Sequence, residues 1–223
     1  MHEYELQGSV AHLRFDDGKA NVVGHDFIDA MLGGLERARG EAQAVVVSGR
    51  EGMFSGGFDL KELQKGPAES ARLVGRGVGM FLEMFRHPQP LLAACTGHAI
   101  AAGAFALLAC DTRFAAAGDY KFGLNETAIG MSLPVFGFQL ADARLSRRHM
   151  TQAVTQSTIY DPSSARDAGF IDTIVEGDVI TAALAEAERL GEFETTAYAA
   201  NKIGWRAPFI AAIEASLADF PAE

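Results

Sequence analysis

Residues 52–60 read Gly-Met-Phe-Ser-Gly-Gly-Phe-Asp-Leu, and the segment Lys-Glu-Leu follows at 61–63. The stretch comes after Ala44–Ser48, an apolar, β-branched run that predicts a buried strand. We therefore expect a glycine-rich loop at 52–60. The adjacent glycines Gly56 and Gly57 let the backbone approach a ligand closely, and they let successive N–H groups point outward together as an anion-binding concavity. Many plain loops contain such a pair, so this loop alone does not establish a binding site.

A second segment, Gly97-His98-Ala99-Ile100-Ala101-Ala102-Gly103, follows a predicted strand at Leu91–Ala94. We expect a turn at Gly97-His98 and then a helix over Ala102–Ala109 that is apolar all round and therefore buried. The first N–H groups of a helix lack intrahelical partners and carry the positive end of its dipole, so a developing negative oxygen would be stabilised there. Close helix packing explains the small residues equally well, and the two roles are compatible.

The third candidate is a single carboxylate in apolar company. Glu126 stands in Leu124-Asn125-Glu126-Thr127, between apolar segments at 120–124 and 128–134. An exposed or helix-capping carboxylate would have no catalytic role. A carboxylate held in an apolar pocket would have a raised pKa, which suits proton transfer near neutral pH. The local sequence leaves both interpretations open.

The remaining periodicity predicts one α/β domain whose C-terminal third is mostly helical. Further strands are expected at Tyr4–Gln7, Val10–Phe15, Arg113–Ala116, Tyr120–Phe122 and Ile171–Val175. Helices are expected at 26–39, 69–85, Val135–Leu145, Arg147–Gln156, Asp178–Leu190 and Pro208–Asp219. The order strand, strand, helix recurs, which indicates a repeated supersecondary unit without a fixed sequence period.

Composition excludes several classes of function. The net charge of −10 argues against a nucleic-acid partner, which would require a basic face. The uncharged stretch Pro88–Cys110 has the length of a membrane helix, but its prolines and glycines divide it, so we expect buried core and no membrane partner. The histidines are scattered without metal-ligand spacing, and Ser55 lacks a GxSxG context. We therefore expect no metal and no serine hydrolysis.

The cysteines and the N-terminal segment bear on the compartment. Cys95 and Cys110 lie in apolar runs outside any CxxC or Cys/His cluster, so we expect buried free thiols in a reducing environment. Met1 to Phe15 shows no basic-then-apolar signal pattern. A cytoplasmic location is the expectation.

Four segments together resemble the crotonase (enoyl-CoA hydratase/isomerase) family. The stretch Phe54-Ser55-Gly56-Gly57-Phe58-Asp59-Leu60-Lys61-Glu62-Leu63 is similar to its F-[CSA]-[AG]-G-x-D-[LI]-x-E loop. Residues 97–111 resemble its G-x-[AC]-x-[AG]-G-G…[AS]-x-D helix motif, and Lys19-Ala20-Asn21-Val22 resembles its K-A-N-A segment. Residues 121–130 with Pro134 resemble F-x-x-x-E-x-x-[IL]-G-x-x-P. Order and spacing agree over roughly Glu3 to Val175, which makes the combination far more specific than any single motif.

For the fold, the resemblance implies ββα units wound into a superhelix, with a core at 1–190 and a helical C-terminal region at 191–223. It also implies homotrimers or homohexamers, with subunit contacts through the C-terminal helices. The chain ends soon after the predicted helix at 208–219, earlier than many members of the family. We therefore expect fewer coenzyme A contacts from that region.

For the site, the resemblance implies a coenzyme A thioester as the substrate and no separate cofactor. It implies that Glu126 is the acid/base and that the backbone N–H groups of Phe58 and Ala102 form an oxyanion hole, although the family usually has glycine at the latter position. Matching positions and expected walls of the acyl pocket, which core packing would explain equally well, add further substrate-binding candidates: Lys19, Ala20, Asn21, Gly57, Asp59, Leu60, Lys61, Gly103, Phe105, Met131, Leu133, Pro134 and Phe136.

The family's hydratases use two glutamates, and the position of the second one holds Phe105 here. Its mitochondrial-type isomerases have an apolar residue at that position and a glutamate in a segment much like 123–127. The resemblance is therefore closest to the Δ3,Δ2-enoyl-CoA isomerases, which need one base. Enoyl-CoA hydratase is the alternative, and a non-catalytic acyl-CoA-binding homologue is a further one. Asp59 and Glu62 are the nearest other carboxylates, and we expect both to be structural or exposed.

Overall fold

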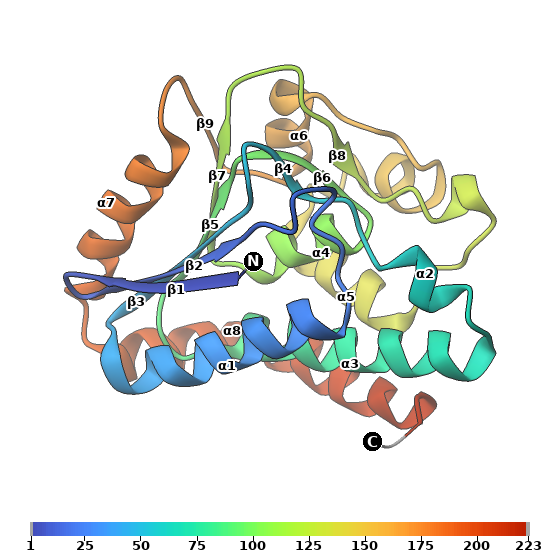
Figure 1. Cartoon of the computed structure of the whole chain (residues 1–223), viewed down its shortest axis with the longest axis horizontal. Helices are drawn as coiled ribbons and strands as arrows, with labels where there is room; N and C mark the ends of the chain where they lie inside the picture. Colours follow the sequence, from blue (N-terminus) through green and yellow to red (C-terminus); the bar gives the residue numbers. More distant parts are fainter. Residues whose placement is uncertain (1, 222–223) are drawn as a thin grey trace.

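Two sheets organise the chain in this computed structural model (Figure 1). The structure describes residues 2–221, so residues 1, 222 and 223, which belong to the predicted ranges 1–190 and 191–223, lie outside the described part. The strands are β1 His2–Gln7, β2 Val10–Phe15, β3 Ala44–Ser48, β4 Gly52–Ser55, β5 Leu91–Cys95, β6 Gly97–Ile100, β7 Thr112–Ala116, β8 Phe122–Gly123 and β9 Thr173–Val175. The larger sheet has the order β1-β2-β3-β5-β7-β9, and the smaller has the order β4-β6-β8.

The helices connect and cover these sheets. They are α1 His25–Glu41, α2 Leu60–Leu63, α3 Pro67–Arg86, α4 Ala102–Ala109, α5 Val135–Arg144, α6 Pro162–Ala168, α7 Val179–Gly191 and α8 Thr195–Ser216, with short turns η1 Thr127–Ile129, η2 Thr151–Thr155 and η3 Leu217–Asp219. Three successive units, β3-β4-α3, β5-β6-α4 and β7-β8-α5, place their first strand in the large sheet and their second in the small one. The predicted superhelix of ββα units is thereby confirmed.

The large sheet is buried on both faces, which explains why its central strands are apolar throughout. Val45 and Val47 belong to the main hydrophobic cluster with residues of α1 and α3, whereas Val46 and Leu92 pack with residues of α7. In Figure 1, α7 lies on one side of the sheet, and α1, α3 and α8 run together on the other. Parallel strands covered by helices on both faces require such continuous apolar runs.

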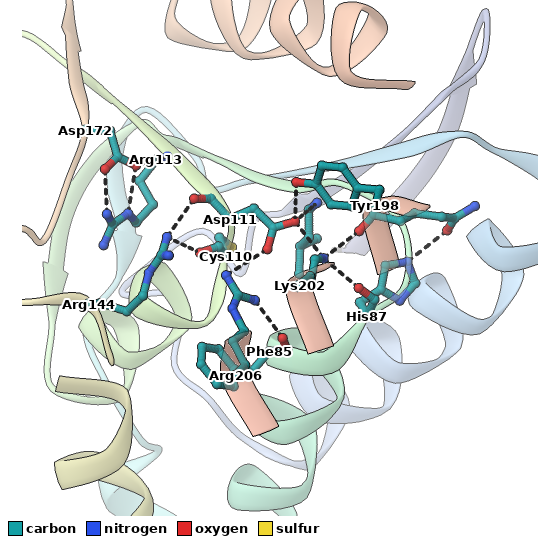
Figure 2. A network of polar contacts seen from close by, with 12 residues as sticks. Phe85, His87, Cys110, Asp111, Arg113, Arg144, Asp172, Tyr198, Lys202 and Arg206 are labelled. Atoms are coloured by element: carbon teal, nitrogen blue, oxygen red, sulfur yellow. Dashed lines mark hydrogen bonds and ion pairs between the residues drawn. The ribbon is translucent and has the colours of Figure 1, made fainter. Parts of the chain in front are cut away.

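Buried charges join the C-terminal helix to the core (Figure 2). Asp111 lies two residues beyond α4, and its carboxylate forms ion pairs with Lys202 at 2.6 Å and Arg206 at 3.0 Å. The Tyr198 hydroxyl donates to the same carboxylate at 3.0 Å. Burial alone would raise the pKa of Asp111, but the charges of Lys202 and Arg206 lower it below its ordinary value. Helix α8 also contributes apolar residues to the main hydrophobic cluster, so it is part of the same core as the sheets. The predicted division of the chain between residues 190 and 191 stays a prediction.

The stretch with the length of a membrane helix is core. Residues 91–109 form β5, β6 and α4, and most of their side chains are buried. Across residues 2–221, the helices are too short or too polar to cross a membrane. Cys95 and Cys110 are buried free thiols, as predicted.

Two short strands replace predicted irregular segments. Gly97-His98 begins β6 rather than forming a turn, because β6 pairs with β4. A Cβ atom on Gly97 would lie 1.9 Å from the carbonyl carbon of Gly52, so this glycine permits a close approach of strands. Likewise, 52–60 is not a continuous loop: its first four residues form β4, and α2 begins at Leu60.

The C-terminal half also departs from prediction. The helix expected at Arg147–Gln156 is a turn followed by η2, a π-helical turn in which Gln156 N donates to Thr151 O at 3.1 Å. The helix expected to begin at Pro208 begins at Thr195, and the proline lies inside α8. The short helix α6 was not predicted, although Asp161 caps its start by accepting from Ser164 N.

Candidate active site

Parallel pairing of β4 with β6 brings the two glycine-bounded segments together. Because parallel strands end at the same edge of a sheet, the residues after Ser55 and after Ile100 emerge side by side. Gly57 marks the contact: a Cβ atom there would lie 3.2 Å from Ala101 Cβ and 3.7 Å from Ala102 N. The two predicted oxyanion donors, Phe58 and Ala102, therefore stand on adjacent strands of backbone.

The hydrogen bonds around Phe58 leave its own amide free. Val23 N donates to Gly57 O at 2.8 Å, and Asp59 N donates to Val23 O at 3.2 Å. This is one parallel bridge between Val23 and Phe58, and in such a bridge the N–H of the central residue points away from its partner. Within residues 2–221 no acceptor faces the Phe58 amide.

Ala102 is the first residue of α4, so its N–H has no intrahelical acceptor. The preceding Ala101 has φ +52° and ψ −121°, a positive-φ conformation that non-glycine residues rarely adopt. This backbone is held by the bond from Ala101 N to Gly123 O at 2.9 Å. The strained residue turns the chain from β6 into α4 and thereby directs the first amides of the helix toward the loop at 56–58.

A cavity of about 220 Å³ opens beside these amides. Its walls are mostly apolar, and its lining residues are Gly56, Gly57, Phe58, Leu60, Leu63, Val74, Ala101, Phe105, Asn125, Glu126, Ile129, Met131, Ser132, Pro134 and Phe136. Phe105 and Phe136 meet edge to face, with ring centroids 5.0 Å apart, and Phe81 stacks behind Phe136 at 5.5 Å. Aromatic packing thus closes one end of the cavity.

Glu126 projects its carboxylate into this cavity from the start of η1. Its carbonyl oxygen accepts from Ile129 N at 3.1 Å and from Met131 N at 2.9 Å, so the backbone is fixed. The residue is 8% exposed, and Oε2 is buried without a hydrogen-bond partner in the described chain. Burial raises the pKa of Glu126 above its ordinary value, and a backbone hydrogen bond counteracts only part of that rise.

The ionisable content of the cavity is small. Among its lining residues in the described part of the chain, Glu126 is the only one with an acidic or basic side chain. Asn125 lies beside it in sequence, and its Oδ1 is likewise buried without a partner within residues 2–221. An apolar cavity with one carboxylate, one unpaired amide oxygen and two free backbone N–H groups has the composition of a proton-transfer site for a carbonyl compound.

The early segment 19–21 braces the site from behind. Gly56 N donates to Ala20 O at 2.8 Å, and Ser55 Oγ donates to Asn21 O at 2.7 Å. Asn21 is buried, and its side-chain amide donates to Phe15 O at 2.8 Å. The Lys19 side chain is exposed outside the cavity, while its carbonyl accepts from Arg50. These contacts are structural, and the predicted contacts of 19–21 with coenzyme A stay predictions.

The other predicted residues divide between wall and support. Gly57, Leu60, Phe105, Pro134 and Phe136 line the cavity, as does Met131.

Asp59 caps α2 by accepting from Lys61 N at 2.9 Å, and the Lys61 side chain is exposed. Gly103 packs on β4, since a Cβ atom there would lie 2.2 Å from Ser55 O. Leu133 is buried behind the wall, where its side chain lies close to Gly137.

Sequence reasoning did not single out four apolar wall residues, Leu63, Val74, Ala101 and Ile129, as parts of the site. Val74 belongs to α3, and nothing in its local sequence distinguishes it from other apolar helix residues, whereas Leu63 and Ala101 lie inside the quoted motifs. Ile129 lies three residues after Glu126, inside the quoted motif, so its position in η1 was the available signal. The carboxylate of Glu62, in contrast, pairs with Lys65 outside the cavity wall, as expected of a structural residue.

Known proteins resemble this chain in sequence and in structure. The sequence model of the enoyl-CoA hydratase/isomerase family matches residues 5–217. The mitochondrial enoyl-CoA delta isomerase 1 of Rattus norvegicus is 27% identical over 186 residues, which are 80% of this chain and 63% of that protein. This chain therefore spans less than two thirds of the length of that relative.

Solved structures agree more completely in length. An enoyl-CoA hydratase/isomerase family protein from Pseudomonas syringae superposes with a TM-score of 0.95 at 35% identity, covering 98% of this chain and 95% of that one. An enoyl-CoA isomerase from Mycobacterium tuberculosis gives a TM-score of 0.93 at 34% identity, covering 97% and 96%. The predicted crotonase fold is confirmed.

Proposed function

Because this chain belongs to the enoyl-CoA hydratase/isomerase family, we propose that this enzyme is a Δ3,Δ2-enoyl-CoA isomerase. The observation that carries the proposal is the single carboxylate of the cavity. Moving a double bond by one position requires one base that takes a proton and returns it two carbons away. Glu126 is such a base, and within residues 2–221 the cavity wall offers no second ionisable side chain.

The proposed reaction begins with the thioester carbonyl oxygen accepting hydrogen bonds from the amides of Phe58 and Ala102. Glu126 removes a proton from C2, and the electrons of the C2–H bond delocalise into the thioester as a dienolate whose negative oxygen the two amides stabilise. The carboxylic acid then returns the proton to C4, and the double bond shifts from C3–C4 to C2–C3. No water and no external acid enter the balance.

The environment of Glu126 supports this shuttle. Its raised pKa brings the carboxylate closer in basicity to the dienolate it must protonate, which favours transfer in both directions. Phe105, buried in the cavity wall, stands where the family's hydratases have their second glutamate. An aromatic ring at that position leaves no group to activate water and helps to exclude it.

The alternative reaction, hydration of a 2-enoyl-CoA, is less well supported. It requires a second acid/base to position and deprotonate water. The other polar side chains of the cavity wall, Asn125 and Ser132, are neutral near pH 7. A purely acyl-CoA-binding role would give no function that compensates for the burial of the Glu126 carboxylate, whose Oε2 has no hydrogen-bond partner in the described chain.

The cavity volume favours a short acyl chain. An apolar cavity of ~150 Å³ holds the six carbons of benzene, so 220 Å³ holds roughly nine non-hydrogen atoms. A thioester group with about six acyl carbons has that size. The proposed substrate is therefore a short 3-enoyl-CoA, with coenzyme A as part of the substrate. Assembly into trimers or hexamers stays a prediction.

The test compares two turnovers in the purified full chain, isomerisation of trans-3-hexenoyl-CoA and hydration of crotonyl-CoA. We expect isomerisation to dominate and Glu126→Gln to lower it by about 10²–10⁴-fold, the range for loss of a general base. Glu176→Gln, at an exposed glutamate outside the cavity wall, is the matched control and should leave the rate unchanged. Dominant hydration, or a Glu126→Gln enzyme with the parent rate, would overturn the proposal.

A further inference from the structure

Three glycines alternate along α3, in the segment Val74-Gly75-Arg76-Gly77-Val78-Gly79. Each glycine inside a helix is unfavourable relative to alanine because it loses more backbone entropy on folding. Three within five residues therefore call for a reason in their surroundings. The surroundings differ sharply: Gly79 has open space where a Cβ would stand, Gly75 lies against Phe220, and Gly77 lies against Phe58.

The contact at Gly77 reaches the proposed oxyanion hole. A Cβ atom on Gly77 would lie 2.5 Å from Cε1 and 2.6 Å from Cζ of the Phe58 ring, far inside van der Waals contact. The ring also contacts Phe81, one turn further along α3, which it meets edge to face with ring centroids 6.3 Å apart. Thus the side chain of the residue whose amide faces the thioester is seated on the bare backbone of α3.

We propose that Gly77 is a positioning residue, which sets the location of Phe58 and thereby both the first oxyanion donor and the width of the acyl cavity. The inference rests on the proposed function for the role of the Phe58 amide. It does not follow from the catalytic residues themselves, because Gly77 lies outside the cavity wall and contributes only the space that its missing side chain leaves.

A methyl group at this position leaves the Phe58 ring two ways to relieve the overlap. It can turn into the cavity that it lines, which narrows the space for the acyl chain. Otherwise the ring can pull its own backbone away from the bridge to Val23, which moves the free N–H from its position. The first response weakens acyl-CoA binding, and the second lowers the rate of the chemical step.

The glycine series provides the experiment with its own controls. Gly77→Ala should lower kcat/KM for trans-3-hexenoyl-CoA by about 10–10²-fold, the scale for a displacement near 1 Å at a reacting centre. Gly79→Ala, which meets no atom within 4 Å, should match the parent enzyme. Gly75 lies on the same helix as Gly77, and the methyl group of Gly75→Ala would overlap Phe220 instead of Phe58. This variant tests whether any steric overlap on α3 lowers activity, and its kcat/KM should stay within about 3-fold of the parent value.

Rescue separates positioning from damage to the helix. In Gly77→Ala/Phe58→Leu the side chain is smaller while the amide remains, so kcat/KM should exceed that of Gly77→Ala and lie within about 3-fold of Phe58→Leu alone. Equal losses in Gly75→Ala and Gly77→Ala, or no rescue by Phe58→Leu, would overturn the inference.

A second readout keeps the test independent of the reaction. The saturated thioester hexanoyl-CoA has no double bond to move, and its dissociation constant can be measured by calorimetry for the parent and all five variants. Gly77→Ala should weaken this binding, and Phe58→Leu should restore it in the double variant. If the parent turns over no enoyl-CoA but this coupling is present, the proposed function fails and the positioning role of Gly77 stands. If the parent is an active isomerase but this coupling is absent, the positioning role of Gly77 fails and the proposed function stands.

Discussion

The ammonium group of Lys202 in α8 lies 2.6 Å from the carboxylate of Asp111, two residues beyond the end of α4. Helix α4 begins at Ala102, whose backbone amide is free. One buried helix therefore links the proposed oxyanion hole at its N-terminus to the C-terminal helix of the chain at its other end. Figure 2 shows the cations gathered there, with Arg144 donating to the carbonyl oxygens of Cys110 and Asp111 at 2.7 and 2.6 Å.

Removing the charge of Asp111 should destabilise the protein strongly. Asp111→Asn leaves Lys202 and Arg206 buried without their counter-ion, and breaking such a pair costs about 3–5 kcal/mol. Denaturant unfolding measures the change. Glu186→Gln is the control, because it breaks an ion pair with Arg189 that is far more exposed than the network at Asp111. This variant should lower the free energy of unfolding by less than about 1 kcal/mol. Equal losses in the two variants would show that the buried network contributes no more than a surface pair.

Stability should also fall in acid through His87. Burial, the largest cause, lowers the pKa of His87 from 6.5 to about 4, so between these values the unfolded chain binds a proton that the folded chain excludes. The contribution of His87 is therefore complete above pH 6.5 and is lost as the pH falls toward 4, up to about 3 kcal/mol at ~1.4 kcal/mol per pH unit.

Unfolding free energies at pH 7 and pH 4.5 test this, with His87→Asn as the variant that cannot titrate. The parent should lose more stability than His87→Asn over this interval, because other titrating groups contribute equally to both. A difference within error between the two losses would remove His87 as the acid-sensitive group.

The rate of isomerisation should depend on the deprotonated form of Glu126. Burial raises the pKa of this carboxyl above its ordinary value, so kcat/KM should rise with pH through a midpoint above that of an exposed glutamate, about 4.3. A pH–rate profile from pH 4 to 8 measures the midpoint. The residual rate of Glu126→Gln should lack this rise, and a parent profile that is flat down to pH 4.5 would exclude a raised pKa.

The strained turn before α4 predicts a trade between stability and activity. Ala101→Gly relieves a φ of +52° that costs an alanine about 1–3 kcal/mol, so we expect the unfolding free energy to rise by about 1 kcal/mol after the greater entropy of the unfolded chain is subtracted. The freer backbone should hold the Ala102 amide less firmly and lower kcat several-fold.

Ala104→Gly, two residues into α4 with ordinary helical backbone, is the matched control for this change. It should lower the unfolding free energy by about 1 kcal/mol or more, the usual effect of glycine in a helix. Destabilisation of similar size in both variants would show that Ala101 carries no relievable strain.

Strong local patterns made parts of this fold predictable from sequence. Val10–Phe15, Ala44–Ser48 and Ala102–Ala109 are observed with the predicted bounds. Ala44–Ser48 and Ala102–Ala109 are completely buried, and in Val10–Phe15 only Arg14 is exposed, so the local apolar signal is strong in all three.

Where tertiary pairing decides, prediction failed. The strands β4 and β6 contain glycines that indicate loops, and only their mutual pairing makes them strands. Pro208 is typical of a helix start, yet α8 passes through it because buried ion pairs and apolar contacts anchor the helix on both sides of the proline.

For the site, the sequence motifs predicted that Phe58, Ala102 and Glu126 belong to one site. Each of these residues lies in a motif next to a strand or helix. The apolar wall was only partly accessible. Val74 faces the cavity because α3 packs beneath the loop at 56–58, and the sequence around Val74 contains no sign of that packing. Whether an apolar helix residue lines the cavity or belongs to the core depends on how ββα units that are distant in the sequence pack against one another.

The charge network at Asp111 cannot form until the ribosome has synthesised α8. Tyr198, the first residue of α8 to reach this carboxylate, lies 87 residues further along the chain. At ~5–20 residues per second, a ribosome needs roughly 4–17 s to deliver it. During that interval the nascent chain holds a carboxylate in its future interior with no cation from α8 to neutralise it. The turn that presents the Ala102 amide is thus translated well before α8, whose Lys202 and Arg206 complete the charge network at the other end of α4.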